Sequence, residues 1–240
     1  MKFLIIAGSC SIEGENYIDI AKSVKAAGAN MLRGGLFKPR SHPDRYSGIG
    51  VAGLEIIKEA KRVTGLPIVS EAMNAEQIGI LYDYVDMFQV GSRNMTASEF
   101  LKEIGKQDKP VLLKRGFGST IQEFIMAADF IRCKGNQNVM LCERGIRTFE
   151  PYTRNTFDIN CIPAVKWLSE FKIIADPSHG TGRAELVGPV ACAAVAAGAD
   201  GVLIEVHTHP KEAKTDAAQS ITPETFEQIV KKINRIRSVL

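Results

Sequence analysis

Four residues with metal-binding side chains follow short apolar segments that lie far apart in the sequence. They are a thiol, an imidazole and two carboxylates: Cys10, His179, Glu205 and Asp216. Each lies at or just beyond the C-terminal end of a run rich in β-branched residues. Such a mixed set of sulfur, nitrogen and oxygen donors can hold one divalent metal ion, such as Mn, Fe, Co or Zn. The sequence therefore predicts a metal centre if folding brings the four together.

Glu205 gives the clearest single indication of such a centre. It lies inside the apolar run Val-Leu-Ile-Glu-Val-His at 202–207. A carboxylate buried in a strand is costly unless a cation or a metal ion compensates its charge. We therefore expect Glu205 to face a positive partner.

Basic residues in glycine-punctuated loops surround these four positions in the sequence. Arg33 and Lys114 end apolar segments, and Arg144 follows Leu-Cys-Glu. Buried cations imply anionic partners, and arginine matches phosphate and carboxylate groups with two parallel hydrogen bonds. The set predicts a ligand with several negative charges: Arg33, Lys38, Arg40, Arg93, Lys114 and Arg144. Lys114 has an alternative role as a Schiff-base lysine, although the neighbouring arginines favour a protonated, anion-binding side chain.

Short apolar segments alternate with helical patterns along the whole chain. Eight segments are expected to be strands: Phe3–Ala7, Asn30–Arg33, Pro67–Glu71, Met87–Val90, Pro110–Lys114, Val139–Glu143, Lys172–Asp176 and Gly201–Val206. Their apolar residues show little alternation, which is typical of parallel strands buried on both faces. Helical periodicity marks the segments between them: Tyr17–Ala27, Val51–Val63, Thr120–Arg132, Ala184–Ala197 and Pro223–Val239.

This alternation predicts an α/β fold, a single (β/α)8 TIM barrel over residues 1–240. A doubly wound open sheet is the alternative, but the turn after the first strand lacks the GxGxxG pattern. Barrel closure would bring the first strand beside the eighth, with the seventh next to it. The four metal-binding residues would then meet at one rim. No composition change divides the chain, and no regulatory domain is expected before Phe3.

Composition excludes several other classes of protein. The chain has 240 residues, 45% hydrophobic and 24% charged, with a net charge of +3. This charge and the absence of a basic block argue against nucleic-acid binding. The apolar run after Lys2 is too short for a secretory signal or a membrane span. Five cysteines without close pairing argue against a disulfide framework, so we expect a cytoplasmic protein with no membrane association.

Several motifs resemble one enzyme family over nearly the whole chain. They are IAGSCSIE at 6–13, LRGGLFKPR at 32–40, QVGSRN at 89–94, PVLLKRG at 110–116, NVMLCERGIRTFE at 138–150, DPSHGTGR at 176–183 and ADGVLIEVH at 199–207. In this order they are similar to the 3-deoxy-arabino-heptulosonate 7-phosphate (DAHP) synthases. The closest resemblance is to the short type I beta form, which is related to octulosonate phosphate synthases.

This resemblance implies a transferase of the shikimate pathway, in its first step, that condenses phosphoenolpyruvate with erythrose 4-phosphate. It assigns the metal to Cys10, His179, Glu205 and Asp216, with Lys38 as a candidate proton carrier. Phosphoenolpyruvate would be held by Arg33, Lys38, Ser92, Arg93, Lys114 and Arg144. The phosphate of the aldose would be held by Arg40 and Ser41. A homotetramer or homodimer is also implied.

Several positions depart from the family pattern. Ser9 stands where the family commonly has proline, directly before Cys10. The stretch His42–Tyr46 adds charged groups beside the inferred aldose site. A sister synthase that uses another aldose phosphate, such as arabinose 5-phosphate, is therefore the main alternative. A non-catalytic barrel is a second alternative, against which the complete set of ligands and cations counts.

Overall fold

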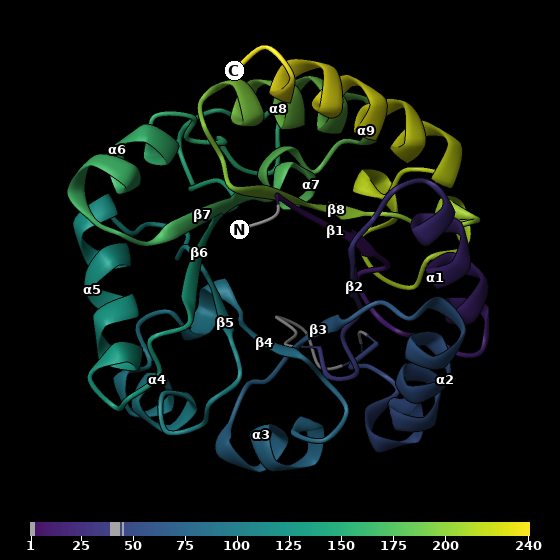
Figure 1. Ribbon diagram of the computed structural model, residues 1–240, viewed down its shortest axis with the longest axis horizontal. Helices are drawn as coiled ribbons and strands as arrows, with labels where there is room; N and C mark the ends of the chain where they lie inside the picture. Colours follow the sequence, from purple (N-terminus) through teal and green to yellow (C-terminus); the bar gives the residue numbers. More distant parts are fainter. Residues whose placement is uncertain (1–2, 39–43, 45) are drawn as a thin grey trace.

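Parallel strands form a closed barrel with an outer ring of helices in the computed structural model, which describes residues 3–38, 44 and 46–240. The strands pair in sequence order and close between the last and the first (Figure 1). Within the described residues they are β1 Leu4–Gly8, β2 Met31–Arg33, β3 Ile68–Glu71, β4 Met87–Val90, β5 Val111–Lys114, β6 Val139–Glu143, β7 Lys172–Ala175 and β8 Gly201–Glu205. The predicted TIM barrel is confirmed.

The helices, with one exception, cover the outside of the strands. They are α1 Asn16–Ala26, α2 Leu54–Thr64, α3 Ala75–Leu81, α4 Ser98–Ile104, α5 Ile121–Arg132, α6 Cys161–Leu168, α7 Pro177–Thr181, α8 Ala184–Ala196 and α9 Pro223–Arg237. The exception is α7, which lies inside the outer ring at the C-terminal end of the barrel. Among the described residues, no helix combines the length and the apolarity that a membrane crossing needs.

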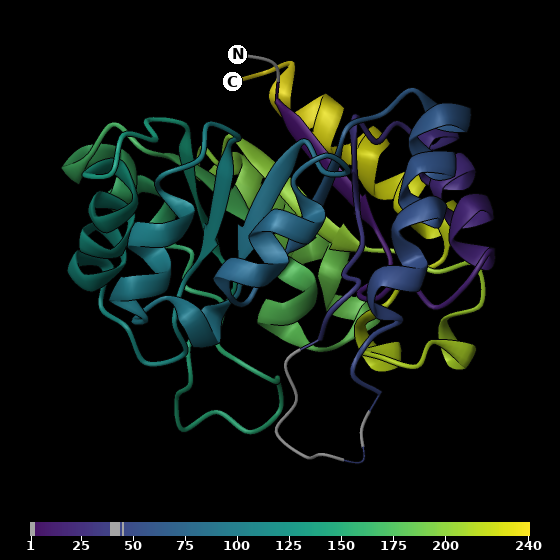
Figure 2. The same ribbon diagram turned by 90° about the horizontal axis from the view of Figure 1, so that it is seen from below.

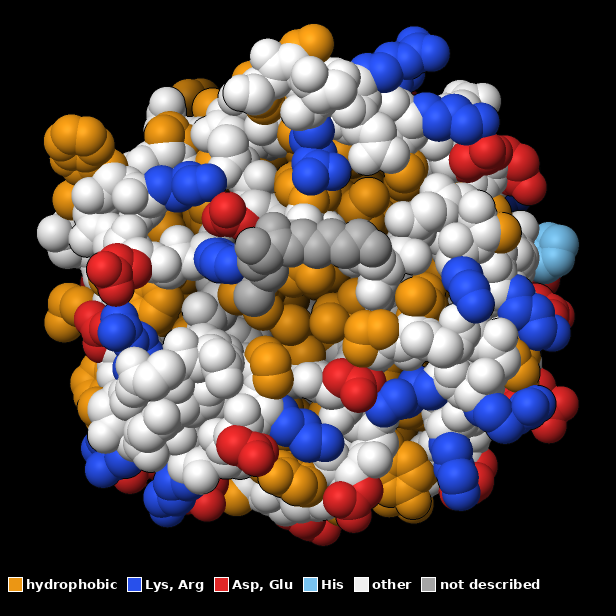
Figure 3. Space-filling view, in the orientation of Figure 1, with side chains coloured by type: hydrophobic (Ala, Val, Ile, Leu, Met, Phe, Trp, Pro, Cys, Tyr) orange, Lys and Arg blue, Asp and Glu red, His pale blue; other side chains and the backbone are white. Residues whose placement is uncertain are grey.

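The core has two layers, as buried parallel strands require. One layer fills the space between the strands and the helices. The other fills the barrel interior and contains Ile6, Met31, Val69, Met87, Leu112, Met140, Cys142, Ile174 and Leu203. Figure 3 views the molecule from the end at which the strands begin, where apolar side chains gather at the centre. The barrel interior is therefore filled with side chains, and the cavity lined by many charged residues lies at the opposite end.

A long connection lies at the C-terminal end of the strands. It follows β6, and Figure 2 shows it at the opposite end of the barrel from the C-terminal end of α9. A bridge between Ile146 and Thr156 folds it back on itself. The active sites of TIM barrels lie at this end of the strands.

Gly8 lets the first strand approach the second closely. Its φ is +149°, and a Cβ atom at this position would lie 2.2 Å from the carbonyl oxygen of Arg33. Only glycine tolerates this combination of backbone conformation and contact. The close approach fixes the path of the chain two residues before Cys10.

Candidate active site

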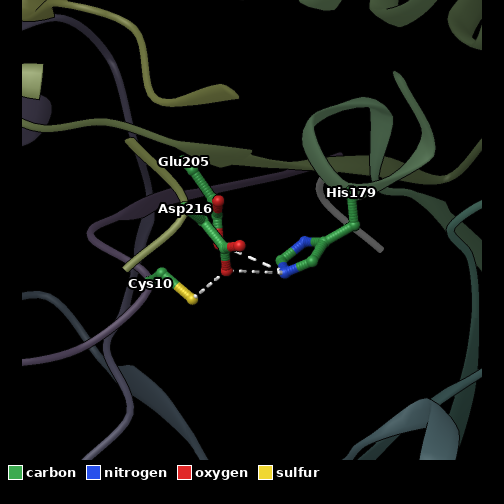
Figure 4. Close-up of side chains that lie close together, drawn as sticks. All are labelled: Cys10, His179, Glu205 and Asp216. Atoms are coloured by element: carbon green, nitrogen blue, oxygen red, sulfur yellow. Dashed lines mark hydrogen bonds and ion pairs between the residues drawn. The ribbon is translucent and has the colours of Figure 1, made fainter. Parts of the chain in front are cut away.

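The four predicted metal ligands meet at the C-terminal end of the barrel. Their donor atoms all lie within 4.8 Å of one another (Figure 4). Cys10 follows β1, His179 lies in α7, Glu205 ends β8, and Asp216 lies between β8 and α9. The β8–β1 and β7–β8 pairings bring these segments together, as the sequence predicts.

Individual contacts tie the cluster together. Cys10 Sγ donates to Asp216 Oδ2 at 2.9 Å. His179 Nε2 lies 3.3 Å from Glu205 Oε1 and 3.8 Å from Asp216 Oδ2. Asp216 has φ +55°, an uncommon conformation for a residue other than glycine, which fixes the direction of its side chain. The donor set of one sulfur, one nitrogen and two carboxylates fits a divalent transition metal.

The protonation of these groups follows from burial and neighbouring charges. Burial raises the pKa of the Cys10 thiol to about 12. Burial also lowers the pKa of His179, so that its imidazole is neutral at pH 7 and has a free electron pair for a metal. Burial alone would raise the pKa of Asp216, but His179, which is charged when protonated at low pH, and the charge of Arg154 outweigh burial and lower that pKa.

His179 is oriented by Asp176, at the start of α7. The Asp176 side chain accepts a hydrogen bond from the backbone N–H of His179 and caps the helix, with Pro177 in its first turn. Asp176 Oδ2 lies 2.8 Å from His179 Nδ1. Metal-binding histidines commonly face a carboxylate in this way on the nitrogen opposite the metal. The predicted strand Lys172–Asp176 ends one residue early because Asp176 is used as this cap.

The same Asp176 oxygen binds Lys114. Lys114 Nζ lies 2.6 Å from Asp176 Oδ2, and both side chains are buried. The contact occupies the Lys114 nitrogen with a carboxylate, whereas a Schiff-base lysine must attack with a free amine. This contact therefore favours the anion-binding role for Lys114.

Both oxygens of Glu205 have hydrogen-bond partners. Arg33 Nη1 donates to Oε1 at 2.7 Å, and Gln219 Nε2 donates to Oε2 at 2.6 Å. Arg33 thus supplies the positive partner that the sequence predicts for this buried carboxylate. It also lines the cavity beside the cluster.

Lys38 lies between the cluster and the cavity. Its Nζ donates to Cys10 Sγ at 3.0 Å and to the Cys10 carbonyl oxygen at 3.2 Å. Burial opposes the charged form, but nearby Cys10 and Glu71 outweigh this effect and raise the pKa of Lys38. Lys38 thus lies as a cation at the edge of the four-donor cluster.

A cationic cavity adjoins the four-donor cluster. His179 and Asp216 form part of its wall, and so does Ser92. Its basic residues come from six positions around the barrel: Arg33, Lys38, Arg93, Lys114, Arg144 and Arg154. The structure thus brings together all the predicted cations except Arg40, which lies outside the described residues, as does Ser41.

Arg144 is a buried cation that forms no ion pair with any of the described residues. Its exposed fraction is 2%, and its Nε has no hydrogen-bond partner. Its Nη1 makes one long contact, 3.4 Å, to the carbonyl oxygen of Gly145. No carboxylate of the described residues lies within ion-pair distance, and burial lowers its pKa. A buried arginine in this state can bind an anion with most of its donors.

Several residues of the site are not predicted from the sequence. Asp176 indicates only a turn before Pro177. Arg154 lies in an irregular connection, where its Nη1 donates to Asp216 Oδ1 at 2.8 Å and to Gln219 Oε1 at 3.0 Å. The cavity wall also includes Glu71, Gln89 and Phe117. Ser9, the departure before Cys10, donates to the carbonyl oxygen of Ser11 at 2.6 Å and so closes that turn.

Comparisons with known proteins agree with this geometry. The model of the DAHP synthetase I family matches residues 1–239. Phospho-2-dehydro-3-deoxyheptonate aldolase of Thermotoga maritima is 43% identical over 239 residues, which are 99% of this chain and 71% of that protein. A 2-dehydro-3-deoxyphosphooctonate aldolase of Desulfatibacillum aliphaticivorans is 30% identical and aligns over 98% of this chain and 92% of its own length.

Solved structures of a DAHP synthase are also similar to this chain. A crystal structure of the Thermotoga maritima DAHP synthase superposes with a TM-score of 0.96 at 42% identity, over 99% of this chain and 70% of that one. A truncated form of the same synthase gives a TM-score of 0.92 at 40% identity, over 99% and 87% of the two chains.

Proposed function

Because this chain belongs to the DAHP synthetase I family, we propose that it condenses phosphoenolpyruvate with erythrose 4-phosphate to give DAHP and inorganic phosphate. The observation that carries the proposal is the position of Arg144. This buried guanidinium, which forms no ion pair with the described residues, lines a cavity that also contains Lys114 and reaches the four-donor cluster. A ligand with both a carboxylate and a phosphate would satisfy these cations.

The reaction forms one carbon–carbon bond and breaks one carbon–oxygen bond. C3 of phosphoenolpyruvate attacks the aldehyde carbon of the aldose, water adds at C2, and phosphate leaves with its bridging oxygen. Lys114, Arg93 and Arg144 hold the two anionic groups of phosphoenolpyruvate, so that C3 faces the four-donor cluster. Holding two reactants in such a geometry replaces a costly bimolecular encounter.

Cys10, His179, Glu205 and Asp216 would hold a divalent metal ion, which as a Lewis acid polarises a carbonyl oxygen. Lys38 Nζ, beside Cys10, would donate a proton to the aldehyde oxygen as it becomes a hydroxyl group. Arg40 and Ser41 would bind the phosphate of the aldose. Asp176 would hold the side chains of His179 and Lys114 at a fixed distance from each other, so that the two reactants meet.

The test is phosphate release from phosphoenolpyruvate with erythrose 4-phosphate, with arabinose 5-phosphate and without an aldose, each with and without EDTA. We expect release with erythrose 4-phosphate that EDTA removes and Mn²⁺ restores. The identity to octulosonate-type relatives makes arabinose 5-phosphate the informative second substrate. Release with arabinose 5-phosphate but not with erythrose 4-phosphate would show that the aldose is arabinose 5-phosphate. Release that EDTA leaves unchanged would contradict the metal site.

A further inference from the structure

Three arginines of the site region surround a single aromatic ring. The guanidinium carbons of Arg144, Arg147 and Arg93 lie 4.7, 5.0 and 5.6 Å from the centre of the Phe117 ring. These distances are within the range of cation–π interactions. Phe117 itself lines the cavity and is partly buried.

The barrel topology explains why the three converge on this ring. Phe117 lies in the connection after β5, between β4 and β6 in the closed sheet. Arg93 follows β4, whereas Arg144 and Arg147 follow β6. The backbone N–H of Arg147 donates to the carbonyl oxygen of Phe117 at 2.7 Å, which ties the β5 and β6 connections together. The ring therefore stands between two neighbouring loops that carry the cations.

An aromatic ring holds a cation differently from a carboxylate. A carboxylate would bind the guanidinium groups, neutralise them and compete with an anionic ligand. The ring face attracts the same groups but carries no net charge. In the described part of the chain, neither Arg144 nor Arg147 forms an ion pair with a carboxylate. Their charges therefore stay available.

We propose that Phe117 is a positioning residue of the anion-binding cavity, whose ring orients Arg144 toward an anionic ligand without neutralising its charge. As the ligand meant here is phosphoenolpyruvate, this inference rests on the proposed function. Arg147 is exposed and does not line the cavity. It contacts the same ring as Arg144, so the ring connects a cavity cation with an exposed cation of the β6 connection.

The experiment measures binding by isothermal titration calorimetry. Wild-type protein and the variants Phe117→Leu, Phe117→Tyr and Phe117→Glu are titrated with phosphoenolpyruvate, with inorganic phosphate and with Mn²⁺. We expect the Leu variant to bind both anions about tenfold more weakly, equivalent to about 1.4 kcal/mol. The Tyr variant should stay within about twofold of wild type, because it keeps the ring face. The Glu variant should bind phosphoenolpyruvate more weakly than the Leu variant, because its carboxylate pairs with the arginines.

A purely structural role for Phe117 would lower the Mn²⁺ affinity and the melting temperature of the Leu variant as well. We expect both quantities to stay close to wild type, since other residues hold the four-donor cluster. The matched control is Phe130→Leu, because the Phe130 ring holds Lys102 at 6.0 Å and does not line the cavity. This control should leave anion binding unchanged. If the Leu variant does not fold, Phe117→Met serves the same test.

The outcomes separate this inference from the proposed function. If wild type binds phosphoenolpyruvate and the Leu and Glu variants bind it equally well, the role of Phe117 is overturned while the proposed function stands. If wild type binds inorganic phosphate but not phosphoenolpyruvate, the substrate assignment fails, and the phosphate titrations still test Phe117. Binding of neither anion by wild type would overturn both.

Discussion

Lys114 and His179 share one carboxylate oxygen. Asp176 Oδ2 lies 2.6 Å from Lys114 Nζ and 2.8 Å from His179 Nδ1, and the exposed fraction of the Asp176 side chain is 0%. One buried acid thus contacts both a cation of the cavity and a member of the four-donor cluster. The opposite charge of Lys114 and the contact with His179 outweigh the effect of burial, so the pKa of Asp176 lies well below its ordinary value.

Asp176→Asn should impair both halves of the site at once. The amide keeps the size of the side chain but removes the charge that orients Lys114 and His179. We expect about tenfold weaker Mn²⁺ binding and a similar rise in KM for phosphoenolpyruvate. Calorimetry and steady-state kinetics measure the two effects. Glu99→Gln, in an exposed pair with Lys102, is the control and should change neither. A change in only one quantity would show that the shared oxygen does not couple the two groups.

Cys10→Ala should abolish metal-dependent turnover and leave the fold intact. Removal of the sulfur takes one of four donors from the cluster. We expect phosphate release to fall by more than about 100-fold, with Mn²⁺ binding weakened in parallel. The circular dichroism spectrum should not change. Cys133→Ala, at an exposed cysteine outside the site, should retain full activity. Normal turnover in the Cys10 variant would exclude this cysteine as a ligand.

Gly8→Ala should destabilise the barrel near the site. The new Cβ would meet the Arg33 carbonyl oxygen at 2.2 Å, in a backbone conformation that alanine rarely adopts. We expect the free energy of unfolding to fall by about 3 kcal/mol. Gly79→Ala is the matched control, since Gly79 lies in α3 with no atom within 4 Å of a new Cβ. It should raise stability by about 0.5 kcal/mol. Urea unfolding of both variants checks the pair, and equal effects would contradict the close approach.

Glu143→Gln should loosen the connection that follows β6. Glu143 Oε2 lies 2.8 Å from Arg115 Nη1, and its Oε1 accepts a hydrogen bond from the Gly145 N–H at 2.6 Å. Both charged side chains are buried, so loss of one charge leaves Arg115 with Asp158 as its remaining acid. We expect a loss of about 3 kcal/mol in unfolding free energy. Glu103→Gln, in an exposed pair with Lys106, should cost less than about 1 kcal/mol. Similar losses in the two variants would argue against a structural role for Glu143.

The strands were predictable because each is buried on both faces. Met87–Val90 and Val139–Glu143 agree with the expected bounds, since mainly apolar residues buried on both faces make up each strand. The five predicted helices correspond to α1, α2, α5, α8 and α9, which have 11 to 15 residues. The helices α3, α4, α6 and α7, with 5 to 8 residues, are too short to show a helical period.

The site was predictable where a polar residue interrupts or ends an apolar strand. Glu205 and Lys114 stand out for this reason, and the structure places both at the C-terminal rim. Asp176 and Arg154 could not be found in the same way. Asp176 precedes a proline and indicates a turn, whereas its function depends on Lys114, 62 residues earlier in the chain. Arg154 lies in an irregular connection and meets Asp216 only through the tertiary fold.

The position of the four-donor cluster across the β8–β1 junction has a consequence for biosynthesis. Cys10 is synthesised long before Glu205 and Asp216, and β1 must wait for β8 before the barrel closes. Until then the thiol lies apart from the other donors. The four donors therefore meet only when the barrel is closed, and a metal ion bound there would fasten the junction between its first and last strands.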